Sequence, residues 1–244
     1  MRAHHWRRSA GASVLGAVAL LVSVPGPPAG ASPTAVTLYA EAIATTKAWS
    51  VHYASEGKFS KVPILESGDA GPASGSQEVL IGAGATADDA TLIVIGDLTY
   101  VKGNIEAMED LLLLPADQAA TAAGQWVLFS TDNPDFSQVV AGVRSHDVAT
   151  ELALKGPYTA GAPRRLDGDE VDTILGTLDI QGHKPLRAAL YVCASAPHDI
   201  VEEDTVNAQG MPDGMEHTVY SKWGERVRPK APPSSLSIGK VSGT

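Results

Sequence analysis

The residues of this chain best suited to chemistry are its histidines, its acidic clusters and one cysteine. His198 and Asp199 are adjacent and could assist a hydroxyl nucleophile, because the roles in a Ser-His-Asp triad are set in space and not by chain order. The sequence has no Gly-x-Ser-x-Gly elbow that would present such a serine. We therefore expect a structural role for both residues and no enzymatic activity, with a hydrolase as a minor alternative.

Cys193 lies inside the apolar run 187–194, which is typical of a buried strand. A reactive thiolate needs an accessible, electropositive setting, so we expect Cys193 to be buried and slow to react. A single cysteine also excludes an internal disulfide and any multi-cysteine zinc or iron–sulfur site. We expect no cofactor and no metal.

The acidic and glycine-rich segments also have plain interpretations. The stretch 167–172 does not match an EF-hand calcium loop, which needs an oxygen ligand at position 5 and glycine at position 6. Here glycine stands at position 2 and valine at position 5, so the stretch predicts a solvated turn. The run 202–204, Glu-Glu-Asp, is interpreted as a solvated charge run. The Gly-Ala-Gly at 82–84 lacks the third glycine and the following helix of a dinucleotide-binding loop.

The charge of the chain argues against two classes of partner. It carries 18 Lys plus Arg against 28 Asp plus Glu, a formal net charge of -10. An acidic protein is poorly suited to bind nucleic acid or an anionic lipid surface by charge. Any lipid contact would therefore be apolar and enclosed.

The N-terminus predicts an export signal over residues 1–31. Arginines at 2, 7 and 8 precede a 13-residue apolar run, 12–24, and Ala29-Gly30-Ala31 forms a small-residue cleavage site. A spanning helix needs about 20 apolar residues, so cleavage near Ala31 is favoured over a permanent anchor. No cysteine lies near this site, so the protein is expected to be secreted or held in the cell envelope without a lipid anchor.

The remaining chain predicts an α+β domain with helices segregated to one side of an antiparallel sheet, because the order is helix, strands, helices, strands. We expect one domain over 32–238 and a flexible tail over 239–244. The predicted helices are 34–49, 105–114, 115–123, 135–143 and 145–154, and the predicted strands are 50–55, 62–66, 77–81, 91–95, 98–101, 125–130, 171–180, 187–194 and 215–223.

Several segments together resemble the LolA-like lipoprotein-carrier superfamily, in its actinobacterial LppX/LprG-type branch. They are Ser-Val-His-Tyr at 50–53, Gly-Gln-Trp-Val at 124–127, Leu-Arg-Ala-Ala-Leu-Tyr-Val at 186–192, and Tyr-Ser-Lys-Trp-Gly-Glu at 220–225 with the proline-rich tail after it. The resemblance implies a strongly curved antiparallel sheet, a half-barrel, with helices packed across its concave face. It further implies a carrier that holds acyl chains of a lipid or lipoglycan between sheet and helices. Many members carry a lipidated cysteine after the signal, and this chain departs from them there.

We expect the cavity to be lined by alternate residues of four strands, since successive strand side chains point to opposite faces. The expected lining residues are Val79, Ile81, Ile93, Ile95, Ile174, Leu178, Leu190 and Val192. On 91–95 the alternative row is Leu92 and Val94. The expected protein is a monomeric, non-enzymatic binder with a possible transport partner in the cell envelope. The alternative is a secreted protein-interaction module whose core is filled and holds no ligand.

Overall fold

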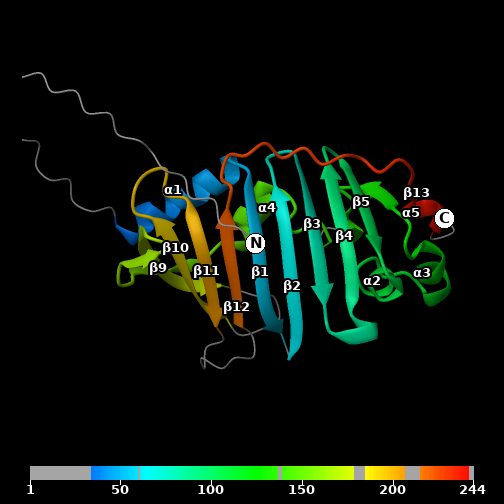
Figure 1. The fold of residues 1–244 in the computed structure, drawn as a ribbon, viewed down its shortest axis with the longest axis horizontal. Coiled ribbons are helices and arrows are strands. Elements are labelled where there is room, and N and C mark those ends of the chain that lie inside the picture. The colour runs from blue at the N-terminus through cyan, green and yellow to red at the C-terminus, as the bar shows by residue number, and fades with distance from the viewer. Residues whose placement is uncertain (1–33, 60, 137–138, 179–184, 207–214, 242–244) are drawn as a thin grey trace, which may run out of the picture. The chain divides into compact units, whose positions relative to one another are not determined.

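The computed structural model describes residues 34–59, 61–136, 139–178, 185–206 and 215–241 (Figure 1). The expected signal segment, 1–31, lies outside these residues. The helices in the described ranges are α1 (Ala35–Ala48), α2 (Ile105–Asp110), α3 (Ala116–Ala122), α4 (Ser145–Glu151) and α5 (Ile238–Val241). None of these described helices is long and apolar enough to cross a bilayer.

The strands of the described ranges form one curved, unclosed and mostly antiparallel sheet. They are β1 (Val51–Phe59), β2 (Val62–Ala70), β3 (Ser74–Ile81), β4 (Asp88–Ile95), β5 (Leu98–Gly103), β6 (Val127–Ser130), β7 (Lys155–Ala160), β8 (Arg164–Leu166), β9 (Asp169–Leu178), β10 (Leu186–Cys193), β11 (Ile200–Val206), β12 (Met215–Ser221) and β13 (Leu236–Ser237). The α+β class expected from the sequence is confirmed.

The sheet consists of two runs of neighbouring strands joined in its middle. Strands β1 to β6 lie side by side in chain order, and β9 to β12 do the same. The two runs meet where β1 pairs with β12, with Tyr53 opposite Tyr220. At the far edge, the two-residue β13 pairs in parallel with β6, after a segment that follows the strand ends in Figure 1.

The pairing register assigns each side chain to one of two faces. We call the inner face the one that carries Val51, Leu92 and Leu190, because these side chains pack with residues of α1, α2 and α4. The outer face carries the intervening residues, such as Ala54 and Leu80. Helices α1 and α4 lie behind the central strands in Figure 1, on the inner side.

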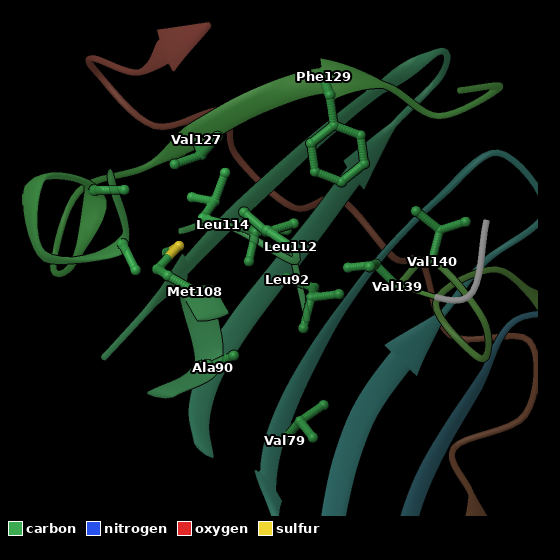
Figure 2. Close-up of a cluster of buried hydrophobic side chains, with 14 of the residues drawn as sticks. Val79, Ala90, Leu92, Met108, Leu112, Leu114, Val127, Phe129, Val139 and Val140 are labelled. Atoms are coloured by element: carbon green, nitrogen blue, oxygen red, sulfur yellow. The ribbon is translucent and has the colours of Figure 1, made fainter. Parts of the chain in front are cut away.

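Two separate apolar clusters cover the inner face. The α1 cluster lies under α1 and α4, and its buried members include Leu38, Val51, Leu152, Ile174 and Leu190. The α2 cluster lies under α2 and α3, and Figure 2 shows Leu92, Met108, Leu112, Leu114, Val127 and Phe129 packed in it. The inner face on either side of its middle strands is therefore largely filled by side chains.

Helix α1 begins and packs as its sequence predicts. The Thr34 hydroxyl accepts a hydrogen bond from the backbone N–H of Thr37 at 3.3 Å and caps the first turn. Leu38, Ala42 and Thr46, spaced four residues apart, are the buried residues of the helix. This spacing explains why the helix lies flat on the sheet with one face buried.

Helix α4 is attached to the sheet through a close approach of backbones. A Cβ atom built on Gly75 of β3 would lie 1.8 Å from the backbone oxygen of Val143. The Ser145 N–H donates to the Gly71 oxygen at 3.1 Å, and its hydroxyl donates to the Lys47 oxygen at the end of α1 at 3.2 Å. A side chain at position 75 would prevent this contact.

The interpretation of 202–204 as a solvated charge run was wrong. These residues belong to β11, which pairs with both β10 and β12. Glu203 points to the inner face and is 8% exposed, whereas Glu202 points to the outer face. Charged residues on both faces concealed the apolar alternation that marks a half-buried strand.

Three further expectations are corrected by the described residues. Within the predicted helix 135–143, only Pro134–Phe136 forms a short 3₁₀ turn, and 137–138 lie outside the described residues. Strands β7 and β8 were not predicted. The expected tail is ordered through Val241, because β13 pairs with β6 and both Ile238 and Val241 pack against the α2 cluster.

Candidate functional site

A polar patch separates the two apolar clusters on the inner face. Glu203, Thr218, Ser55 and Glu66 form one row across β11, β12, β1 and β2, as successive register partners. This row continues into Leu190 on one side and Val79 on the other. We call the patch the acidic centre and define it as Tyr53, Ser55, Glu66, Glu151, Glu203, Thr205, Glu216, Thr218 and Tyr220.

Neutral donors hold the carboxylates of the acidic centre. Ser55 donates to Glu216 at 2.7 Å and Thr218 donates to Ser55 at 3.0 Å, which makes a short hydroxyl chain. The Tyr220 hydroxyl donates to Glu203 Oε2 at 3.3 Å. On the other side, the Gln77 amide donates to Glu66 Oε2 at 3.2 Å.

Glu151 brings a further carboxylate to the centre from the last residue of α4. Its Oε2 lies 3.1 Å from the point where a Gly142 Cβ would stand, and the Gln77 amide nitrogen lies 3.5 Å from that point. Glu151 and Glu216 are both reached by solvent, whereas Glu203 is buried. Solvent therefore reaches the acidic centre on the side of Glu151 and Glu216, while its Glu203 side is buried.

Burial and mutual repulsion raise the pKa values of these carboxyls. Burial, and then the Glu216 charge, raises the pKa of Glu66 to about 7. Glu151 is exposed as a whole residue, but its carboxyl end is surrounded by protein, and this burial, followed by the charge of Glu66, raises its pKa to about 8. Burial together with Glu216 raises the pKa of Glu203 to about 8, although the Tyr220 hydrogen bond opposes this rise. Near neutral pH the centre therefore holds protons that exposed carboxyls would have lost.

The charged and titratable groups around these carboxyls come from several elements. They are Tyr39 of α1, Tyr53 of β1, Glu66 of β2, Arg144 and Asp147 at the start of α4, Glu151 at its end, Glu203 of β11, and Glu216 and Tyr220 of β12. Arg144 is paired with Asp147 at 3.0 Å. Acids and phenols therefore dominate the groups around the centre.

Comparison with solved structures identifies the fold. No protein-family model matches the chain, and no curated protein matches its sequence. The crystal structure of LprF from Mycobacterium bovis superposes with a TM-score of 0.52 at 15% identity, over 82% of this chain and 99% of that one. The chain has a LolA-like fold of the LppX/LprG type. At this identity the likeness shows the fold alone.

Two more solved structures are similar at lower TM-scores and add no argument of their own. Lipoprotein LppX from Mycobacterium tuberculosis matches with a TM-score of 0.43 and 18% identity, over 78% of this chain and 97% of that one. A LolA superfamily protein from Nitrosomonas europaea matches at 0.30 and 12%, over 81% and 96%.

This LppX/LprG-type fold places six of the eight predicted lining residues on its inner face, in two groups. Val79 and Ile81 belong to or pack against the α2 cluster. Ile174, Leu178, Leu190 and Val192 belong to or pack against the α1 cluster. The acidic centre lies between the groups. Whether these residues line a ligand site stays a prediction.

On β4, the prediction that Ile93 and Ile95 face inward was wrong. Leu92 and Val94 are 1% and 0% exposed in the α2 cluster, whereas Ile93 and Ile95 lie on the outer face and are half-buried. The register decides this, because Leu92 pairs with the inner Val101. Four consecutive apolar residues carry no alternation that could have shown which row faces inward.

Sequence reasoning missed the acidic centre entirely. Its carboxylates come from positions 66, 203 and 216, which strand pairing brings together, and from position 151 at the end of α4. One signal was available: β1, β11 and β12 have polar residues on both faces, which is unusual for strands at the middle of a sheet.

The residues suspected of nucleophilic chemistry do not assemble into a catalytic group. The ring nitrogen Nδ1 of His198 lies 2.9 Å from the backbone oxygen of Cys193, and Nε2 lies 3.4 Å from Glu41. Asp167 and Gly168 form the turn between β8 and β9, which confirms the solvated turn. In the described part of the chain, no group of three or more His, Cys, Asp or Glu residues is arranged to hold a metal ion.

Cys193 should react slowly with thiol reagents. It is half-buried and not fully buried as the sequence predicted, and burial together with the charges of Asp199 and Asp169 raises the pKa of its thiol. We expect native labelling at pH 8 to be well below the rate in denaturant. Labelling by a maleimide followed by mass spectrometry measures this, and equal native and denatured rates would contradict it.

Proposed function

We propose that this protein is an exported, non-enzymatic carrier or binder of an amphiphilic lipid, held between sheet and helices. The observation that carries the proposal is the open end of the inner face. There Ile64, Ile81 and Leu178 point to the helix side but are only half-buried, and Val62 is 41% exposed. Inward-facing apolar side chains that the described residues leave partly uncovered favour an apolar ligand.

The arrangement of the inner face suits an amphiphile in particular. Ile64 and Ile81 are register partners on β2 and β3, next to Glu66 and Val79 in the adjoining row. An acyl chain of the ligand that lies along these apolar residues would bring its polar headgroup to the acidic centre. The LppX/LprG-type fold supports the same role, and the predicted signal over 1–31 supports export.

Ile81→Trp tests the proposal against a matched variant on the other face. We expect the indole to occupy the open end and to reduce lipid binding several-fold, with the melting temperature nearly unchanged. Ile93→Trp, on the adjacent strand and equally half-buried but on the outer face, should leave binding intact. The measurement is lipid extracted from purified protein, quantified by mass spectrometry, together with thermal unfolding.

A second candidate is a protein-interaction module, and one feature of the outer face favours it. A hollow of about 710 Å³ lies over β12 and β1 to β4, with Leu65, Leu80 and Val219 exposed in it and Glu56 and Glu78 beside them. If neither tryptophan variant alters bound lipid because the wild type holds none, the carrier proposal fails and this outer hollow becomes the better candidate.

A further inference from the structure

We propose that the acidic centre binds a protonated amine, so that the ligand is an amphiphile with a cationic ammonium group. This inference rests on the proposed function for the apolar part of the ligand. It goes beyond that function because it assigns the polar part of the site and its charge.

Unpartnered polar atoms at the base of the centre point to a missing ligand. The Tyr53 hydroxyl, Glu203 Oε1 and Thr205 Oγ1 are buried and have no hydrogen-bond partner among the described residues. Their residues are 4%, 8% and 2% exposed, so these groups belong to a buried surface and not to the protein exterior. Buried polar groups are nearly always satisfied, and three such atoms on one face need an explanation.

All three atoms belong to residues of the inner face, two on β11 and one on β1. Thr205 pairs in register with Glu216, and Glu203 pairs with Thr218 on the same inner face. The Tyr53 ring crosses Gly68, since a Cβ built there would lie 2.7 Å from the phenol oxygen. This brings the Tyr53 hydroxyl toward Gln77, which is the register partner of Gly68 and holds Glu66.

Once its carboxyls are ionised, the charge of the site selects a cation. Carboxylates from β2, α4, β11 and β12 converge here, and the donors that reach Glu66, Glu203 and Glu216 are an amide and hydroxyls. Burying several carboxylates is costly unless a positive charge offsets them. An ammonium group supplies one positive charge and three N–H donors, which match acceptors arranged on several sides. A phosphate or carboxylate headgroup would be repelled.

Isothermal titration calorimetry at pH 8 with decylamine, decan-1-ol and butylamine tests the inference. We expect decylamine to bind more tightly than decan-1-ol. Glu203→Gln and Glu66→Gln, tested singly, should each weaken decylamine about tenfold, as for the loss of a charged hydrogen bond. Decan-1-ol binding should be unaffected. Glu202→Gln, the neighbouring residue on the outer face of β11, is the matched control and should bind decylamine normally.

The pH dependence gives an independent readout. Decylamine stays protonated up to pH 9, while Glu66, Glu151 and Glu203 ionise between about pH 6 and 8.5. Decylamine affinity should therefore rise over this interval, and the rise should shrink in Glu203→Gln. A purely structural role for Glu203 would alter stability without altering this slope.

The outcomes separate the inference from the proposed function. If decylamine and decan-1-ol bind equally and the inner variants change neither, the amine inference is overturned and the carrier proposal stands. If neither long-chain probe binds, both fail. If butylamine binds as tightly as decylamine, the amine site is supported and the carrier proposal is contradicted. Thermal unfolding of each variant shows whether it is folded.

Discussion

Gly75→Ala should lower the free energy of unfolding by about 3 kcal/mol, at the upper end of the cost of overpacking a core. The added methyl group would lie 1.8 Å from the Val143 oxygen and 2.8 Å from the Asp69 oxygen, both backbone atoms. Backbone on both sides leaves no flexible side chain that could move away. Relief therefore requires the segment before α4 to separate from the sheet.

Gly176→Ala provides the control for Gly75. It is also an inner-face strand glycine, but its nearest neighbours are Leu154 Cδ1 and Cβ at 3.1 and 3.2 Å and the Lys155 oxygen at 3.3 Å, so a shift of a few tenths of an ångström makes room for a methyl group. We expect a clearly smaller loss there. Urea unfolding followed by circular dichroism measures both variants. A loss of unfolding free energy below about 1 kcal/mol for Gly75→Ala would mean that α4 is loosely attached to the sheet. It would contradict the close contact between Gly75 and the Val143 oxygen described above.

The second large effect is that the protein should become less stable as the pH rises from about 5 to about 8. The folded state keeps a proton on Glu203 up to about pH 8, whereas the unfolded chain releases it near 4.5. Unfolding therefore releases protons in this interval, so higher pH favours the unfolded state. The stabilisation is complete below pH 4.5 and is lost as the pH passes through about 8. The raised pKa values of Glu66 and Glu151 act in the same direction.

Glu203→Gln should remove much of this slope. One unit of pKa shift corresponds to about 1.4 kcal/mol, so the shift of Glu203 from 4.5 to about 8 corresponds to a difference on the order of 5 kcal/mol. At pH 8.5 the variant should therefore be more stable than the wild type, and at pH 5 nearly equal to it. Urea unfolding across this range measures the effect, with Glu202→Gln expected to keep the wild-type slope. A wild-type stability that does not change between pH 5 and 8.5 would show that the inner carboxyls are hydrated and not buried.

The sequence predicts the elements whose burial follows a simple period. Helix α1 has an apolar stripe, β3 alternates Val79 and Ile81 with Glu78 and Leu80, and β10 alternates Leu190 with Arg187 and other residues. In α1 and β3 one face is buried and the other is exposed, so the period shows which residues face inward. On β10 the inner row is clear as well, although Tyr191 on the outer face is also buried. Strand β4 lacks that contrast, because both of its faces are apolar.

The acidic centre was beyond prediction for a different reason. Its residues are paired by strand register over separations such as Ser55 to Thr218, and no local pattern encodes that pairing. Strand β11 was missed because its acids face both ways. The functional part of the inner face thus depends on long-range pairing, whereas the two apolar clusters could be anticipated strand by strand.

The pairing of β1 with β12 also determines when during folding the site can exist. The first strand and the last long strand of the domain are neighbours, so the middle of the sheet closes only after the whole chain between them is available. Contacts of such large sequence separation form slowly, because the entropy of closing the loop is lost before the contact stabilises the chain. Ser55 and Glu66 lie on one side of this junction, and Glu203 and Glu216 on the other. A nascent or truncated chain that lacks β12 can form the α2 cluster but has no acidic centre. Binding of a ligand at the acidic centre therefore requires the completed fold.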